Sequence, residues 1–420
     1  MEKTDTQFIS AIASGEMMSR YLNGYARERH DELEEDEIMH PLTKSYLLES
    51  GRNAQKIGSI TAIMNRNHIR LELIDERLYR VFDQNKSEYM GFLEAAPPRY
   101  FIFYTMRRSD ESDPWIRKIT RIRELDHIWL SNSAFQVLLQ KIAQLHKPYR
   151  YVKIGFRRDN IYQIEQENFP PDEAAAWPEK IMADERKSPK RPLTNLTMLE
   201  PLVLIQAKMM ELRELFAPQT INLLRFPSSL ERGGHDFYDN GKVINRSGNF
   251  EDHRNHLFYV LRFYNHLLNY TEEIIWNSSV KETVTIPGVS QKLVGVPVLV
   301  KFSKPLGDET FDYWLTATFG RMNNRFRLWG NPVRLNSQKV HVYVVDQHLW
   351  QPFFLEITTG HLTAILPTGT CGNTIHRLVT NIQRYLDPMV EVFIGNRRYE
   401  DLVVQSIEGV VYERLGCVLQ

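Results

Sequence analysis

The sequence has little of what normally assigns a protein to a compartment or class. Only two cysteines, Cys371 and Cys417, occur, so no disulfide framework is expected. The 52 basic side chains equal the 52 acidic ones, so there is no general cationic excess for coating a polyanion. No apolar run approaches the ~18 residues of a membrane span, and residues 1–10 lack a signal-peptide pattern. We expect a cytoplasmic protein without membrane contact.

Internal repeats of solenoid or propeller length are also absent. At 420 residues the chain exceeds the size at which one hydrophobic core keeps growing, so several domains are expected. The apolar share of 42% and aromatic share of 11% are typical of folded domains rather than of long disordered chains.

We predict a multi-domain α+β (mixed α/β) protein with an N-terminal α/β unit, a helical middle and a C-terminal, largely antiparallel sheet with flanking helices. The linker is assigned from its prolines, which interrupt helices and remove backbone donors. The predicted parts are a helical segment over 1–50, an α/β domain over 51–167, a proline-rich linker over 168–195, a helical region over 196–275 and a sheet domain over 276–420.

Hydrophobic periodicity predicts individual elements. Apolar residues at helical spacing predict helices over 133–146, 198–216, 251–270 and 374–386. Alternating or apolar runs predict strands at 69–73, 100–104, 149–156, 296–302, 313–319, 325–329, 340–345 and 410–412, and a hairpin joining 353–357 to 362–366. The glycine- and asparagine-rich segment 232–248 is predicted to be a loop.

Basic residues interleaved with aromatic ones give the strongest binding signal. Guanidinium groups beside an exposed aromatic ring suit phosphates and stacked bases. If 325–329 is a strand, Arg325, Arg327 and Trp329 point to one side of it. An ordinary charged sheet face is the simpler explanation, and a protein-docking face is a third. The candidate nucleic-acid-binding residues are Arg321, Arg325, Arg327, Trp329, Arg334, Arg150, Lys153, Arg157 and Arg158.

A glycine-bearing loop, 368–374, lies between a predicted strand and a predicted helix. A helix N-terminus presents free amides and partial positive charge to an anion. Cys371 and Arg377 also have the Cys-x5-Arg spacing of cysteine-dependent phosphatases, in which the thiolate attacks phosphorus. A tight strand-to-helix turn is the simpler explanation. The candidate anion-binding residues are Gly369, Cys371, Gly372 and Arg377.

Two further patterns concern metals. Asp346 and Glu356 lie near strands and about ten residues apart, as in metal-dependent nucleases, but the usual lysine two positions later is replaced by Thr358. Histidines gather at 235, 253, 256 and 266, yet the last three do not share one helix face. We therefore expect exposed or hydrogen-bonded histidines, and no metal or cofactor.

No complete catalytic constellation is present, and no motif supports a family name. The predicted function is a non-enzymatic accessory or adaptor subunit of a cytoplasmic prokaryotic assembly, which binds another protein. Antiviral defence is the expected setting by base rate alone. One alternative is nucleic-acid binding through the basic-aromatic strands. Another is phosphoester hydrolysis, either at Cys371 and Arg377 or at a metal held by Asp346 and Glu356.

Overall fold

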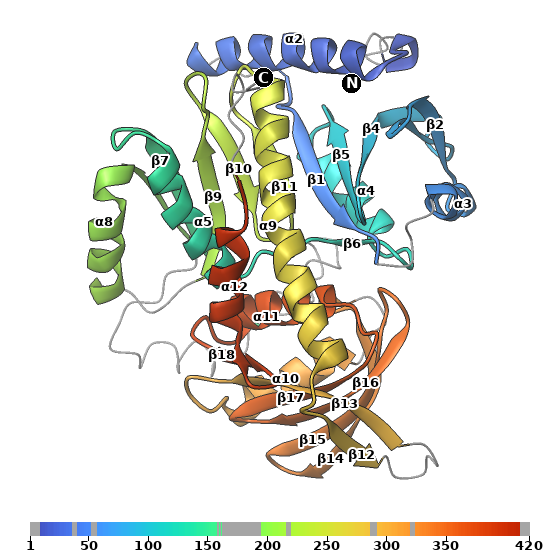
Figure 1. Cartoon of the computed structure of the whole chain (residues 1–420), viewed down its shortest axis with the longest axis vertical. Coiled ribbons are helices and arrows are strands. Elements are labelled where there is room, and N and C mark those ends of the chain that lie inside the picture. The colour runs from blue at the N-terminus through green and yellow to red at the C-terminus, as the bar shows by residue number, and fades with distance from the viewer. Residues whose placement is uncertain are drawn as a thin grey trace. The chain divides into compact units, whose positions relative to one another are not determined.

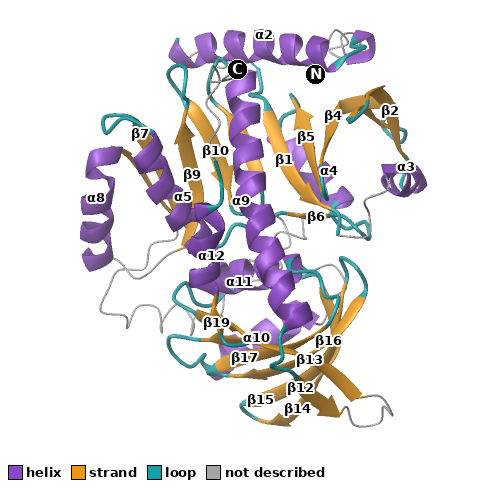
Figure 2. Cartoon of the chain, viewed as in Figure 1, coloured by secondary structure: helices purple, strands orange, loops and turns teal. Residues whose placement is uncertain are grey.

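The computed structural model describes residues 9–35, 40–51, 57–157, 159, 161, 195–215, 220–285, 292–319 and 324–411. The chain forms two compact units, one of Met1–Ile128, Leu223–Tyr264 and Val410–Gln420, the other of Trp129–Asn222 and Asn265–Gly409. Both contain antiparallel sheet and helices (Figures 1 and 2), which confirms the predicted multi-domain α+β class. Among the described helices, none is long and apolar enough to cross a bilayer.

An antiparallel sheet forms the first unit. Its strand order is β2-β3-β4-β5-β1-β11-β10-β9, and β6 also pairs with β1. The strands are β1 (Lys44–Glu49), β2 (Ile69–Asp75), β3 (Leu78–Asp83), β4 (Glu88–Ala96), β5 (Tyr100–Thr105), β6 (Asp126–His127), β9 (Thr220–Pro227), β10 (Gly234–Tyr238) and β11 (Lys242–Asn245). The helices are α2 (Gly15–Glu34), α3 (Ile57–Arg66), α4 (Ser109–Ile119) and the first part of α9 (Phe250–Asn277).

Strand alternation divides the side chains of this sheet between two cores. Tyr46 of β1 and Phe103 of β5 belong to the core that contains Trp115 of α4. On the opposite face, Ser45 of β1 and Tyr104 of β5 contact the first turns of α9. The start of α9 therefore covers the face of β1 that carries Ser45, and Figure 1 shows this part of α9 beside β1 and β11.

The second unit has its own antiparallel sheet, in the order β14-β15-β16-β17-β13-β18-β19, with β12 on β13. The strands are β12 (Glu282–Thr285), β13 (Lys292–Lys301), β14 (Leu328–Asn336), β15 (Lys339–Asp346), β16 (Gln351–Thr358), β17 (His361–Pro367), β18 (Glu391–Ile394) and β19 (Arg397–Arg398). Its helices are α5 (Asn132–Leu145), α8 (Leu202–Leu215), the end of α9, α10 (Asp308–Phe319), α11 (Asn373–Tyr385) and α12 (Tyr399–Glu408), and β7 (Tyr151–Arg157) forms a hairpin with β8 (Asn195–Pro201).

Most predicted elements are confirmed. The helices at 133–146, 251–270 and 374–386 correspond to α5, α9 and α11, and Ser131 caps α5 by accepting a hydrogen bond from the Ala134 amide. The hairpin of 353–357 with 362–366 is β16–β17. The predicted linker lies outside the described residues except for Asn195, and Tyr412 of the predicted strand 410–412 also lies outside them.

Several predictions are wrong. The segment 1–50, predicted to be helical, ends in the strand β1, and the region 196–275, predicted to be helical, contains the strands β9, β10 and β11. Residues 313–319 are helical, because Phe311, Trp314, Leu315 and Thr318 form one buried stripe at helical spacing. The helix predicted at 198–216 begins only after Pro201, since 195–201 pair with β7 as a strand. In the segment 325–329, β14 begins only at Leu328. The predicted loop 232–248 contains the strands β10 and β11.

Candidate functional site

Three histidines and one aspartate meet in the interior of the first unit. His235 lies on β10, while Asp252, His253 and His256 lie in the first turns of α9. All four residues are at most 2% exposed. One ligand atom each from His235, Asp252 and His256 lies within 4.8 Å of the others. We call His235, Asp252 and His256 the histidine–aspartate cluster.

Glycines allow His235 to reach this position. Gly233 (φ +85°) precedes β10, and Gly241 (φ +72°) forms the β10–β11 turn, both in a region that favours glycine. Gly234 pairs so closely with β9 that a Cβ atom would lie 2.3 Å from the Phe226 carbonyl oxygen. The same glycines that suggest a loop in the sequence therefore build a hairpin beside α9.

Hydrogen bonds fix the carboxylate of Asp252. Its Oδ2 accepts from Ser228 Oγ at 2.7 Å and from the Ser229 amide at 3.0 Å, and it lies 3.2 Å from His235 Nε2. Burial alone would raise the pKa of Asp252, but the hydrogen bond with His235 and the neighbouring His256 and Ser228 hold that pKa below its usual value. The carboxylate is therefore ionised inside the unit.

His253 connects the cluster to β1. Its Nε2 lies 2.8 Å from Ser45 Oγ and its Nδ1 lies 3.2 Å from Nδ1 of His235. Burial, reinforced by the nearby His235 and His256, lowers the pKa of His253 well below the usual value for histidine. This ring is therefore neutral.

The sequence pattern did not reveal this cluster. Asp252 and His256 are four residues apart, so they lie on one side of a helix, but their partner His235 sits in the segment predicted to be a loop. His266, the fourth histidine of the group, lies in the part of α9 that belongs to the second unit. The expectation of hydrogen-bonded histidines holds for His235, His253 and His256.

The predicted anion loop is occupied by protein groups. Arg377 is fully buried, donates from Nε to the Phe326 carbonyl at 2.8 Å and forms an ion pair with Asp346 at 2.6 Å. The Cys371 amide donates to Gln351 Oε1 at 3.0 Å. These contacts contradict the proposed role of Arg377 and the loop amide in holding a phosphate.

The Gly372 amide of this loop faces a carboxylate. It donates to Glu272 Oε1 at 3.2 Å, and an acidic side chain at this position disfavours a bound anion. Gly369, with φ +92°, forms the tight turn before α11. The strand-to-helix turn is thus the structure found, and Gly369, Cys371, Gly372 and Arg377 do not form an anion site.

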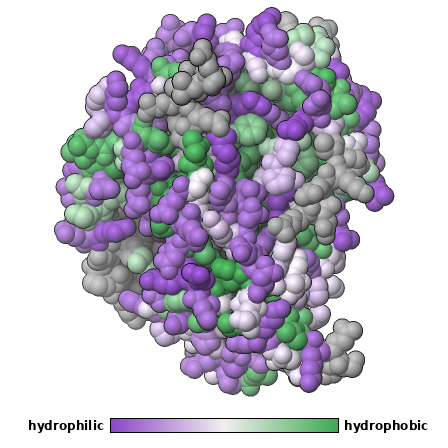
Figure 3. Space-filling view, viewed as in Figure 1, coloured by the Kyte–Doolittle hydropathy of each residue, from purple (hydrophilic) through white to green (hydrophobic). Residues whose placement is uncertain are grey.

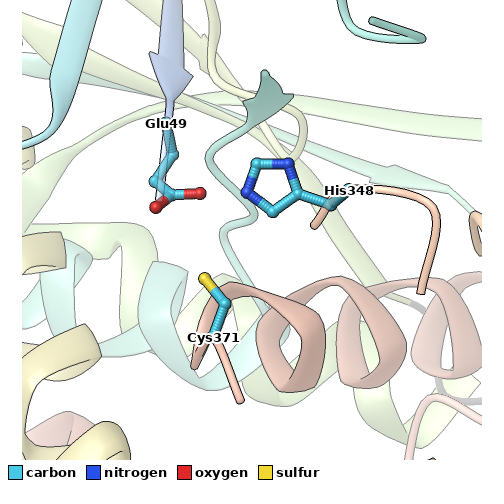
Figure 4. A group of neighbouring side chains, drawn as sticks. All are labelled: Glu49, His348 and Cys371. Atoms are coloured by element: carbon cyan, nitrogen blue, oxygen red, sulfur yellow. The ribbon is translucent and has the colours of Figure 1, made fainter. Parts of the chain in front are cut away.

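Figure 4 shows the thiol of Cys371 and the imidazole of His348 on neighbouring segments of the second unit, with ligand atoms within 4.8 Å. Both side chains are buried. Glu49, also drawn, belongs to the first unit and ends β1. Within its own unit, its Oε1 accepts from Arg99 Nε at 2.7 Å and from the Gly51 amide at 2.6 Å.

The two carboxylates of the nuclease hypothesis do not meet. Asp346 is directed toward α11, where it contacts Arg377 and Thr374. Glu356 pairs across the strands with His341. His341 and Asp346 are an odd number of residues apart on β15, so their side chains lie on opposite faces of the sheet. Its Oε2 lies 2.7 Å from Lys339 and 2.9 Å from His341. The geometry contradicts a shared metal site.

The arginines of 321–334 do not form an exposed basic strand. Arg325 is held by Asn381 Oδ1 at 2.9 Å and packs over the rings of Trp129 and Tyr385. Arg327 is buried in a turn with φ +53°. Arg334 pairs with Asp312, and Arg321 lies outside the described residues.

The second basic segment is also engaged. Arg157 pairs with Asp159, and both Arg150 and Lys153 have interaction partners. Tyr149 and Tyr151 beside them are exposed, while Arg158 lies outside the described residues. Of the candidate residues in this segment, the structure pairs Arg157 with an acid.

An exposed aromatic patch lies on β14, β15 and the turn after β15. The register pairs Trp329 with Val345, Asn331 with Tyr343 and Val333 with His341, on the face opposite Asp346. The rings of Trp329 and Trp350 are 6.4 Å apart. We define the aromatic patch as Trp329, Asn331, Val333, Tyr343, Val345 and Trp350.

A cavity of about 520 Å³ lies elsewhere in the second unit, a volume typical of small-molecule sites. Phe156, Met209, Gln383, Arg398 and Glu400 contribute to its lining. Burial raises the pKa of Glu400, as do the neighbouring carboxylates. Its Oε2 is buried and has no hydrogen-bond partner in the described part of the chain.

Two antiparallel sheets, each with its own helices, define a two-unit α+β protein, with a buried histidine–aspartate cluster in one unit and an aromatic patch on the other. The family model of the MJECL33-like proteins matches residues 12–401, and the chain belongs to this family. It is 22% identical over 416 residues to the uncharacterized protein MJECL33 of Methanocaldococcus jannaschii, a match that covers 91% of this chain and 95% of the relative. No solved structure matches the chain.

Proposed function

We propose that the protein is a non-enzymatic accessory subunit that docks a partner protein on its aromatic patch. The observation that carries this proposal is the exposure of three large apolar side chains on one sheet face, Trp329 (45%), Val333 (56%) and Tyr343 (42%), and of Trp350 (45%) in the adjoining turn. On the face drawn in Figure 3, hydrophilic residues predominate and hydrophobic ones form separate groups. A contiguous aromatic patch marks an interaction site.

The charges around the patch favour a protein over a nucleic acid. No patch residue is charged, and the nearby cations are paired: Arg334 with Asp312, and Lys339 with Glu356. Binding to a polyanion requires cations that can replace its counterions. An uncharged aromatic centre with a rim of paired charges instead matches the composition of protein interfaces. The partner we propose therefore presents an apolar surface.

Tryptophan and tyrosine suit this role because they are the side chains that most often dominate binding energy at interfaces. Trp329 and Trp350 make a T-shaped pair, with an interplanar angle of 66°. The β14–β15 ladder holds the rings of Trp329 and Tyr343 in place before a partner arrives, and Trp350 lies in the turn after β15. Membership of a cytoplasmic prokaryotic assembly, and antiviral defence as its setting, stay predictions.

The test is an affinity capture of the full chain from its native host, with and without nuclease, followed by reconstitution with the purified partner. We expect a nuclease-resistant partner that is lost from the double variant Trp329→Ala, Tyr343→Ala. The matched control, Tyr149→Ala with Tyr151→Ala, removes two exposed aromatic residues of the same unit and should retain the partner. Retention by the patch variant would contradict the proposal. Loss on nuclease treatment would support nucleic-acid binding instead.

A further inference from the structure

The donor set of the histidine–aspartate cluster is that of a transition-metal site. Two imidazoles and one carboxylate are ligands that zinc and related divalent ions accept. His235 Nε2 and Asp252 Oδ2 are 3.2 Å apart. Two ligands of a tetrahedral ion with bonds of about 2.0–2.1 Å lie about 3.3 Å apart. The observed spacing therefore fits an ion bound between them.

Nδ1 of each ring faces an oxygen acceptor, and in known metal sites such contacts fix the tautomer. His256 Nδ1 donates to the Asp252 carbonyl oxygen at 2.7 Å, so in the neutral ring the lone pair is on Nε2. His235 Nδ1 lies 3.2 Å from Asn245 Oδ1, which also accepts from the Ser247 amide at 3.0 Å. Without an ion, Nε2 of His235 donates to Asp252; with an ion bound, the ring proton would lie on Nδ1 and Nε2 would bind the ion.

The Asp252 carboxylate is held in place by the residues around the site. Ser228 Oγ and the Ser229 amide donate hydrogen bonds to its Oδ2 at 2.7 and 3.0 Å. Contacts of this kind orient a ligating carboxylate in known metal sites.

We infer that His235, Asp252 and His256 bind a divalent transition-metal ion of the zinc class in the interior of the first unit. The ion would connect β10 to the start of α9. Three protein ligands leave one position of a tetrahedral ion for a water molecule, and because all three side chains are at most 2% exposed, that position is shut off from bulk solvent. This inference does not depend on the proposed docking function.

The test uses the full chain, stripped with a chelator and titrated with Zn²⁺ or Co²⁺. We expect one ion per chain, with Co²⁺ giving visible d–d absorption without a thiolate charge-transfer band, and a higher melting temperature when metal is bound. A thiolate band that disappears in Cys371→Ser would place the ion at Cys371 and overturn the assignment. Wild-type protein that takes up neither ion would also overturn it, with histidinium then balancing Asp252.

Variants locate the ion among the histidines. Changes to residues that only orient ligands typically weaken metal affinity by about 10–100-fold, so His235→Asn, Asp252→Asn or His256→Asn should each weaken it by more than about 100-fold. His253→Gln removes an equally buried neighbour of the ligands, and it should weaken metal affinity by no more than about 100-fold. His127→Gln, a buried histidine on β6, should leave affinity unchanged. Only variants with wild-type circular dichroism are compared; ligand variants that retain full affinity would refute the site.

Discussion

Arg377 of α11 and Asp346 of β15 form a buried ion pair, with Nη2 2.6 Å from Oδ1 and side chains that are 1% and 0% exposed. The Asp346 carboxylate also accepts from the His348 amide at 2.9 Å and from the Thr374 hydroxyl. Each charge thus has several hydrogen-bond partners, which is the condition under which a buried pair is tolerated. The pair ties α11 to its sheet.

Breaking this pair should strongly destabilise the second unit. Asp346→Asn or Arg377→Met leaves one buried charge without its partner, so we expect a loss of about 3–5 kcal/mol in the free energy of unfolding. The double variant Asp346→Leu, Arg377→Met should lose less than the sum of the single changes. Urea unfolding measures these values. Asp312→Asn, which breaks the exposed pair with Arg334, is the control and should cost at most about 1 kcal/mol. Equal costs in the two pairs would contradict this account.

Glu400 should make the stability of the fold depend on pH in the interval just above the usual glutamate pKa. Its pKa is raised in the folded chain, mainly by burial, so the folded state binds more protons than the unfolded state between the usual glutamate pKa and the raised one. Its stabilising contribution is therefore complete below the usual pKa and is lost as the pH rises through the raised value. As the pH rises through this window, the melting temperature of Glu400→Gln should fall less than that of the wild type. At neutral pH the variant should melt at a higher temperature than the wild type. Glu408→Gln, an exposed residue of the same helix, should behave as wild type.

Two glycines of the first unit should respond oppositely to alanine. Gly91 of β4 has φ +146°, and a Cβ atom there would lie 2.0 Å from the Tyr104 carbonyl oxygen, so Gly91→Ala should destabilise by several kcal/mol, roughly 3 or more. Gly24 lies within α2 and has nothing within 4 Å of its Cβ position, so Gly24→Ala should stabilise by about 0.5–1 kcal/mol. Chemical unfolding checks both; a neutral Gly91→Ala would show that β4 is not held as described.

The elements that could be predicted are those with a regular spacing of apolar residues. In α11, Ile375, Leu378, Val379 and Ile382 repeat at helical spacing, which identified the helix although its polar residues are buried as well. The β16–β17 hairpin was predictable because its two apolar runs flank a short turn. These signals are local, so they survive without knowledge of the rest of the fold.

The sites depend on pairings that no local pattern encodes. Arg325 and Arg327 lie in a basic-aromatic pattern typical of nucleic-acid-binding strands. Their side chains are instead directed by a hydrogen bond to Asn381 and by the turn before β14. His235 meets Asp252 only because β10 pairs with β9 and β11 beneath α9. Long-range register, rather than residue type, decided which side chains met.

The thiol of Cys371 should be unreactive in the native state. Cys371 is 2% exposed, so a reagent cannot reach its sulfur. The amides of its loop donate to Gln351 and Glu272, so they are not available to hold a phosphate next to the thiol. In a Cys417→Ser background, Ellman's reagent should label the remaining thiol slowly in native buffer and within the mixing time in guanidinium. Generic phosphoester hydrolysis should be absent, and Cys371→Ser should not change that. Rapid native labelling together with a hydrolytic activity lost in Cys371→Ser would restore the phosphatase hypothesis, because it would require a loop conformation in which these contacts are broken.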